Sequence, residues 1–156
     1  MEWKHTNKIA RTFFLPKVKE LLNLLEKREY KFVEDLSPRL QKHKIPFCLS
    51  DTEFGSATVF ISKTYGLVFK IFGHCQSLRE FSNAKDIYPK LAIPTLLVKA
   101  GAFLVRIQPI AKTDEKSIAQ CRQIIDKTMN KKKIFGNDCK NHNIGIWNNK
   151  CVVFDW

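Results

Sequence analysis

The chain has 156 residues, of which 44% are hydrophobic and 27% charged, which fits one compact domain or two small lobes and excludes a large multidomain machine. Its 27 Lys and Arg against 15 Asp and Glu give a net charge of +12, so the surface should attract phosphate, nucleic acid or acidic proteins. The basic residues are spread along the whole chain and form no basic tail. Net charge is thus the only argument for nucleic acid, and it makes no strong case.

The cysteines indicate a reducing compartment. They are odd in number and irregularly spaced, which suits neither a disulfide framework nor a paired zinc site, and we interpret them as reduced thiols. They are Cys48, Cys75, Cys121, Cys139 and Cys151. Residues 1–8 lack the apolar run of a cleavable signal, and no stretch approaches the roughly 20 apolar residues of a membrane span. We expect a soluble cytoplasmic protein, with delivery into a host cell by a dedicated secretion machine as the alternative.

Residues 1–47 are predicted to form a helical N-terminal extension. Apolar residues recur at helical spacing after Pro16, which can occupy the first turn, and predict a helix over 16–30. They are Val18, Leu21, Leu22 and Leu25. A weaker helical pattern over 33–43 is expected to be interrupted or restarted at Pro38.

Strand-like alternation begins at Phe47. Residues 57–62 and 67–72 predict a hairpin that turns at 63–66, where Gly66 favours the turn. The segment from Ser77 to Glu80 has the form of a capping box and predicts a helix that ends before Pro94. A second hairpin is expected from 96–98 and 103–107, with its turn at 99–101.

The last third of the chain predicts a helix and a further hairpin. Residues 114–130 carry an apolar stripe at helical spacing, and the lysines at 131–133 suit a solvated helix end. Short strands are then expected at 143–147 and 150–154. This order of segregated helices and strands predicts an α+β fold rather than a parallel α/β sheet.

Three oxygen-bearing side chains stand out near the end of the sequence. Asp138 and Asn143 lie five positions apart on a predicted loop, and Asp155 follows an apolar strand. Magnesium prefers oxygen ligands, so this set predicts a magnesium–phosphate site. The alternative is an ordinary hairpin with polar turns, where Asp and Asn are common in any case.

Lys70 could complete that site. It lies inside the apolar strand 67–72, where a buried ammonium group would need anionic partners. The alternative is a strand lysine that faces solvent by simple alternation. The order of the signals favours the functional interpretation, because Lys70 follows a hairpin with Gly55 and precedes a helix with Glu80 and then the late oxygen donors.

At this point the chain resembles the protein-kinase-like fold over roughly residues 48–156. Residues 54–60, FGSATVF, resemble an eroded glycine-rich loop, and residues 67–70, LVFK, resemble the Val-Ala-Ile-Lys strand. Residues 138–143, DCKNHN, resemble the catalytic loop, and residues 154–156, FDW, stand where Asp-Phe-Gly would begin. The resemblance implies a two-lobed architecture, with an N-lobe at about 48–108 and a strongly reduced C-lobe at about 109–156.

The resemblance also implies roles for individual residues. The catalytic residues would be Asp138 as acceptor of the hydroxyl proton, Lys140 at the γ-phosphate, and Lys70, which would hold the α/β-phosphates and pair with Glu80, with Asp86 in reserve. Asn143 and Asp155 would hold Mg²⁺. ATP would contact Gly55 and Ser56 of the loop, Lys70, and a hinge over 107–110 with Gln108 and Ile110.

The implied activity is that of a minimal serine/threonine protein kinase that uses ATP and Mg²⁺ on a partner protein, similar to effector kinases of bacterial pathogens or kinase fragments of viruses. The glycine loop keeps one glycine, the residues before Asp138 are Gly136 and Asn137, and the sequence ends after the metal motif. These departures leave two alternatives: an inactive pseudokinase or kinase mimic that acts as a binding module, and a lipopolysaccharide-core sugar kinase.

Overall fold

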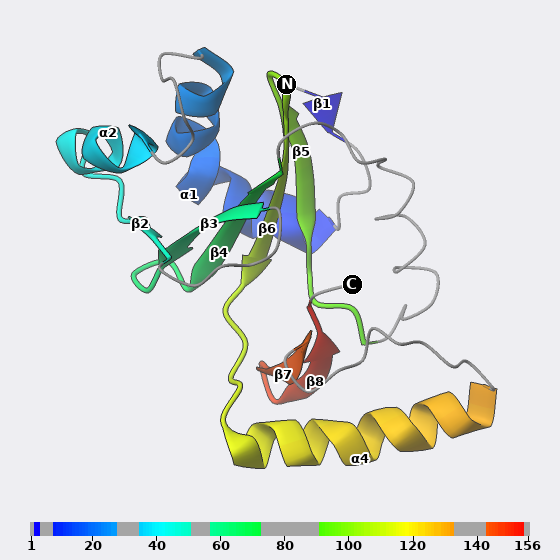
Figure 1. The fold of residues 1–156 in the computed structure, drawn as a ribbon. Coiled ribbons are helices and arrows are strands. Elements are labelled where there is room, and N and C mark those ends of the chain that lie inside the picture. The colour runs from blue at the N-terminus through cyan, green and yellow to red at the C-terminus, as the bar shows by residue number, and fades with distance from the viewer. Residues whose placement is uncertain are drawn as a thin grey trace. The chain divides into compact units, whose positions relative to one another are not determined.

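The structure is a computed structural model of the whole chain, and it describes residues 2–3, 8–27, 35–50, 57–72, 91–132 and 143–154. The fold is α+β, as the sequence predicts (Figure 1). The chain divides into two compact units. The first comprises Met1–Gln76 with Pro94–Pro109, and the second comprises Ser77–Ile93 with Ile110–Trp156.

Six strands in the first unit form one antiparallel sheet in the order β1-β5-β6-β4-β3-β2 (Figure 1). The strands are β1 (Glu2–Trp3), β2 (Cys48–Leu49), β3 (Ala57–Ser62), β4 (Leu67–Phe72), β5 (Leu96–Ala100) and β6 (Phe103–Pro109). Both expected hairpins, β3–β4 and β5–β6, are confirmed. The central pairing of β4 with β6 joins strands that are not consecutive in the chain.

Glycine residues and a hydroxyl side chain stabilise the turns of these two hairpins. Gly66 adopts φ +63° at the end of the β3–β4 turn, a left-handed conformation that glycine adopts without steric cost. The amide of Tyr65 donates to the Ser62 hydroxyl oxygen at 3.1 Å and stabilises the same turn. The β5–β6 turn is at residues 101–102 rather than at 99–101, because β5 continues to Ala100 and Gly101 takes the positive φ.

Helix α1 (Lys8–Lys27) packs against one face of this sheet (Figure 1). The prediction that a helix starts at Pro16 is wrong, since α1 begins at Lys8 and contains Pro16. Phe14 explains the difference, because it is buried in the same core as Val18, one helical turn later. Burial of this stripe favours continuing the helix through the proline, although the proline removes one backbone donor.

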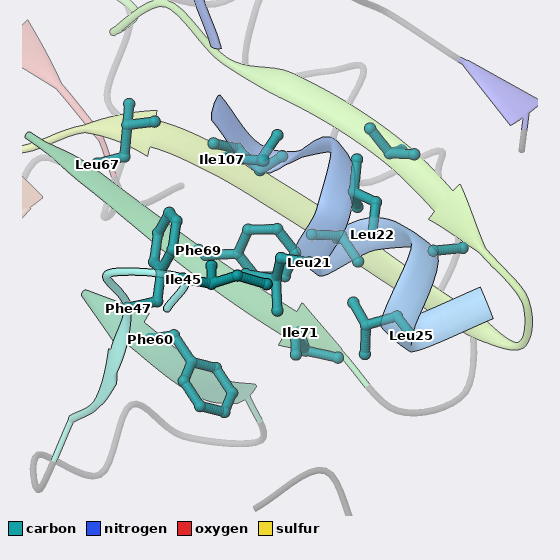
Figure 2. Close-up of a cluster of buried hydrophobic side chains, with 14 of the residues drawn as sticks. Leu21, Leu22, Leu25, Ile45, Phe47, Phe60, Leu67, Phe69, Ile71 and Ile107 are labelled. Carbon is teal, nitrogen blue, oxygen red and sulfur yellow. The ribbon is translucent and has the colours of Figure 1, made fainter. Parts of the chain in front are cut away.

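Figure 2 shows how side chains of α1 and of the sheet meet in the core of the first unit. Leucines of α1 lie over aromatic and aliphatic residues of β3, β4 and β6. Phe47 joins the sheet side and makes edge-to-face contacts with Phe69 and Tyr65, at ring-centroid distances of 5.9 and 6.0 Å. The labelled members are Leu21, Leu22, Leu25, Ile45, Phe47, Phe60, Leu67, Phe69, Ile71 and Ile107. The N-terminal helix thus shares one core with the sheet.

Helix α2 (Leu36–Lys42) is shorter than the helical pattern over 33–43, and residues 33 and 34 lie outside the described residues. Pro38 does not interrupt it, which corrects the prediction. The proline stands in the first helical turn, where its missing N–H would have no intrahelical acceptor. Leu36 and Leu40 bury one side of α2 in the same core.

The second unit is built from helix α4 (Glu115–Lys132) and the hairpin β7 (Ile144–Trp147)–β8 (Lys150–Val153). Both were predicted, and Asn148 and Asn149 take the positive φ values of the hairpin turn. Backbone bridges extend the hairpin on both sides, from Lys112 to Ile146 and from Ala92 to Val153. A small core joins helix and hairpin. It contains Leu91, Cys121, Ile125, Ile144, Cys151 and Val153.

The expected helix from Ser77 lies outside the described residues. Among the residues that are described, no helix combines the length and the apolar character needed to cross a membrane.

Candidate functional site

The structure describes some of the predicted site residues and leaves others outside its described ranges. Lys70, Gln108, Ile110 and Asn143 are described. The others lie outside, and they are Gly55, Ser56, Glu80, Asp138, Lys140 and Asp155. Lys70 and Gln108 belong to the first unit, whereas Ile110 and Asn143 belong to the second.

Lys70 lies in the middle of β4 and is buried, with 6% of its surface exposed. Its neighbours Phe69 and Ile71 both belong to the core under α1. Because successive strand residues point to opposite faces, the Lys70 side chain lies on the other face of the sheet. The alternative of a solvent-facing strand lysine is therefore wrong. A buried ammonium group is costly unless anionic groups compensate it.

Arg106 is a second buried cationic residue on this face, and no motif in the sequence predicted it. It pairs directly with Lys70 across β4 and β6, and only 2% of it is exposed. Residues directly opposite on antiparallel strands share a face, with Cβ atoms about 5 Å apart. Arg106 also stands inside an apolar strand, which is the signal that identified Lys70. The pairing of β4 with β6 was not visible in the sequence, because β5 lies between them in the chain.

Gln108 and Thr95 extend the polar character of this face. Gln108 is two residues after Arg106 on β6 and is therefore on the same face, with 3% exposed. Its amide Nε2 donates to the Thr95 hydroxyl oxygen at 3.0 Å. This buried hydrogen bond fixes the amide and satisfies part of its bonding capacity. We name the set Lys70, Arg106, Gln108 and Thr95 the polar face.

The residues of the predicted hinge over 107–110 lie in different places: some are on opposite faces of the sheet, and the last follows the end of β6. Ile107 is fully buried in the core under α1, so it is not available to a ligand, which corrects that part of the prediction. Ile110 follows β6 directly and is 39% exposed, a large apolar side chain open to contact.

Asn143 precedes β7 in the second unit. The amide of Phe154 donates to the Asn143 carbonyl oxygen at 3.0 Å, so the end of β8 lies beside the start of β7. Asp155 follows Phe154 in the sequence. The Asn143 side-chain oxygen is shielded from solvent. This amide is the one member of the predicted magnesium set that is described, and carboxamide oxygens are suitable magnesium ligands.

Neighbouring features of the second unit have structural explanations. The thiol of Cys121 donates to the Gly145 carbonyl oxygen at 2.8 Å, and the sulfur of Cys151 lies 3.6 Å from the Cys121 carbonyl oxygen. Both cysteines are buried and neither is in a disulfide, which agrees with reduced thiols in a small core. Within the described ranges, no group of three or more His, Cys, Asp or Glu residues could hold a metal ion.

No protein-family model matches the chain, and neither curated proteins nor solved structures give a match. The resemblance to protein kinases therefore depends on the quoted motifs and not on overall similarity. The described residues themselves provide two buried cationic side chains in one unit and a carboxamide oxygen, a possible metal ligand, at a hairpin end in the other.

Proposed function

We propose that the chain is an ATP- and magnesium-dependent phosphotransferase of the protein-kinase-like class, acting on a serine or threonine hydroxyl of a partner protein. In this proposal the first unit corresponds to the N-lobe and the second to a reduced C-lobe. The observation that carries the proposal is the buried position of Lys70 on the face of the sheet that α1 does not cover.

The placement of Lys70 within the sheet supports this function. In protein kinases the lysine that binds the α/β-phosphates stands on the third strand of the small-lobe sheet. Counted from residue 47, Lys70 is on the third strand, after β2 and β3, and these three strands pair consecutively. A lysine held there by flanking core residues is preorganised for an anionic ligand, so little side-chain entropy remains to be lost on binding.

The geometry of the β7–β8 hairpin supports the proposal that Asn143 and Asp155 are metal ligands. The hydrogen bond from Phe154 to Asn143 brings together the two strand ends next to which the predicted ligands occur in the sequence. Asn143 stands just before β7, and Asp155 is joined to Phe154. An amide and a carboxylate supplied from one hairpin end suit Mg²⁺, which binds through few protein ligands and keeps several waters.

The proposed reaction is an in-line displacement at the γ-phosphorus. The substrate hydroxyl oxygen forms the new P–O bond while the bond to the β–γ bridging oxygen breaks and ADP leaves, and Asp138 accepts the hydroxyl proton. Lys70 holds the α/β-phosphates in the reactive geometry, and Lys140 offsets charge on the transferred group. Bound magnesium, on Asn143 and Asp155, would offset the negative charge of the phosphates. Positioning and charge compensation supply most of the acceleration.

Nucleotide binding is the first test, and thermal unfolding measures it. A ligand at 100 times its Kd stabilises a protein by about 2.7 kcal/mol, which for a chain of this size raises Tm by roughly 5–10 °C. We expect MgATP to raise the Tm of the wild-type chain and to have little effect on Lys70→Met. Lys99→Met, which removes an exposed lysine from strand β5 of the same sheet, is the matched control and should respond like the wild type.

Transfer of radiolabelled phosphate from ATP to a protein acceptor is the second test. Asp138→Asn should reduce the rate by about 100-fold or more, since general-base catalysis contributes at least that factor. Asp126→Asn, which removes an exposed acid on α4, should leave the rate unchanged. Equal rates for wild type and Asp138→Asn would contradict the enzymatic proposal.

The two alternatives give different results in the same assays. Binding of MgATP without transfer to any acceptor would favour the pseudokinase, and transfer to a lipopolysaccharide-core sugar but not to protein would favour the sugar kinase. The absence of any thermal shift at millimolar nucleotide would contradict nucleotide binding itself.

A further inference from the structure

Three exposed lysines from different parts of the first unit lie near one half-buried tyrosine. Tyr65 belongs to the β3–β4 turn, and its ring contacts the Phe47 ring edge to face at 6.0 Å. The ammonium nitrogen of Lys17, on α1, lies 5.9 Å from the centroid of the Tyr65 ring, a cation–π contact. Lys63 stands two residues before Tyr65, and Lys44 stands three residues before Phe47. We name Lys17, Lys44 and Lys63 the basic patch.

The backbone keeps the basic patch within the reach of one short peptide. Two or three residues of chain span at most roughly 7 to 11 Å, which limits how far Lys63 lies from Tyr65 and Lys44 from Phe47. An extended segment of about eight residues, at roughly 3.3 Å per residue, is therefore long enough to reach all three lysines. In the part of the chain that the structure describes, no carboxylate forms an ion pair with any of them.

Lys44 adopts a backbone conformation that glycine usually provides. Its φ is +53°, just after the end of α2. The amide of Lys44 donates to the Gln41 carbonyl oxygen at 3.0 Å, and the next amide, of Ile45, donates to the Leu40 carbonyl oxygen at 2.9 Å. These two hydrogen bonds form a Schellman motif, which favours glycine at the Lys44 position because a side chain there is strained. Strain of this kind is typical of functional positions, so it points to a role for the Lys44 charge.

Charge complementarity favours an acidic protein segment as the partner of the basic patch. Lysine offers a compact charge without a fork of donors, which suits carboxylates in no fixed orientation. A nucleic-acid strand is held by bases stacked on aromatic rings, but Tyr65 has Lys17 over its ring and Phe47 against it. Binding to a membrane surface needs apolar side chains that insert, and the large exposed ones among the described residues lie outside α1, α2 and the β3–β4 turn.

We propose that the basic patch is a docking surface for an extended acidic segment of a partner protein, whose carboxylates face Lys17, Lys44 and Lys63. The patch adjoins the core beneath α1, to which Phe47 belongs, whereas Lys70 lies on the other face of the sheet. Docking therefore goes beyond the proposed phosphotransfer and does not depend on it.

Fluorescence anisotropy of a labelled glutamate-rich peptide of about ten residues tests the proposal, with a glycine–serine peptide of equal length as the neutral probe. One lysine-to-glutamine substitution in the basic patch should weaken binding about two- to fivefold, the range for an exposed ion pair. The triple variant should weaken it by roughly 10- to 100-fold, because separate sites add in free energy. A second triple variant with the same net charge is the matched control and should stay within about threefold of the wild type. It carries Lys99→Gln, Lys116→Gln and Lys127→Gln, all at exposed positions outside the patch.

Lys44→Gly separates a role in binding from a role in folding. Glycine relieves the strain at φ +53°, so we expect Tm to rise by about 2–4 °C while affinity for the glutamate-rich peptide falls about two- to fivefold. Lys44→Arg keeps both the charge and the strain, and it should bind the peptide like the wild type. A Lys44→Gly chain that binds as tightly as the wild type would contradict a role for the charge.

Three other results would overturn the proposal. The first is equal affinity of the wild type for the glutamate-rich and the glycine–serine peptides. The second is equal weakening by the two triple variants, since net charge alone would then explain binding. The third is tighter binding to single-stranded poly-dT or to phosphatidylserine vesicles than to the peptide, with loss of that binding in the patch variant, which would assign the patch to nucleic acid or to a membrane. MgATP binding is measured separately, so failure of docking leaves the proposed function standing.

Discussion

In the first unit, helix α1 buries a continuous aliphatic and aromatic layer against one face of the sheet, whereas in the second unit a few side chains, two of them cysteines, join helix α4 to a hairpin. A large core gains stability from apolar area removed from water. Among the described residues, fewer buried side chains form the core of the second unit. Its described segments are also held by backbone bridges, an asparagine turn and a helix cap. We therefore expect the stability of the first unit to depend mainly on buried side-chain volume. The stability of the second unit should depend more on close backbone contacts.

The strongest test of this difference is a large-to-small substitution in the first core. Phe69 is fully buried at the centre of the sheet and contacts Phe47 edge to face. Phe69→Ala should lower the free energy of unfolding by about 3–5 kcal/mol, as lost burial and a new cavity both contribute. Urea denaturation followed by far-ultraviolet circular dichroism measures the change. Leu49→Ala, at a half-exposed edge position, should stay within about 0.5 kcal/mol of the wild type.

A backbone contact should be the sensitive point of the second unit. A Cβ atom on Gly145 would lie 2.5 Å from the Lys112 carbonyl oxygen and 3.2 Å from the Ala111 Cβ. The same Lys112 carbonyl accepts the Ile146 amide at 3.0 Å, so it cannot move without loss of that bond. Gly145→Ala should therefore lower the free energy of unfolding by about 1–3 kcal/mol, the usual cost of overpacking.

Gly66 offers the matched control for that substitution. No atom lies within 4 Å of a Cβ built there, but its φ of +63° requires a residue that tolerates the left-handed region. Gly66→Asn should change the free energy of unfolding by no more than about 0.5 kcal/mol, because asparagine adopts this conformation readily. If Gly145→Ala is as well tolerated in urea as Gly66→Asn, steric exclusion does not govern the second unit.

The smallest effect is expected at the start of α4. The Ser117 hydroxyl donates to Asp114 at 2.7 Å and its amide donates at 3.0 Å, and these two hydrogen bonds lower the pKa of Asp114 from its ordinary value of 3.8. A lowered folded-state pKa gives stability that is present above the unfolded value and is lost as pH falls through the folded value.

The Tm difference between wild type and Asp114→Ala should accordingly be present at pH 7 and shrink as pH falls below 4. Thermal scans across this range measure it. Asp126→Ala removes an exposed acid that pairs with Arg122 at 3.9 Å on the same helix, and it controls for loss of charge alone. A Tm difference for Asp114→Ala that is the same at pH 7 and at pH 2 would exclude the ionised cap as its source.

Much of this fold could be predicted because its signals are local. Alternation of apolar residues and a glycine at the turn predicted the β3–β4 hairpin, and two short apolar segments predicted the β7–β8 hairpin. The start of α1 could not be read in this way, because Pro16 resembles a first-turn residue until tertiary packing places Phe14 in the core. Local preference and tertiary burial disagreed there, and burial decided.

The candidate site was predictable only in part. Lys70 could be predicted as a site residue because it is a charged residue inside an apolar strand. Arg106 stands in an apolar strand in the same way, but it was not predicted as a site residue. What distinguishes the pair is their register, and that depends on β4 lying beside β6. Adjacency between strands that are not consecutive depends on the packing of the whole sheet, so no local pattern in the sequence specifies it.

Pro16 has a consequence for how helix α1 opens. Without an amide hydrogen, this residue cannot close the helical bond to the carbonyl of Thr12, so the ladder is interrupted between the first two turns and the buried leucine stripe. The turns before Pro16 can then fray without breaking the bonds that hold Leu21 to Leu25. Amide protons in that later segment should exchange with deuterium most slowly within the helix, as its opening requires disruption of the core.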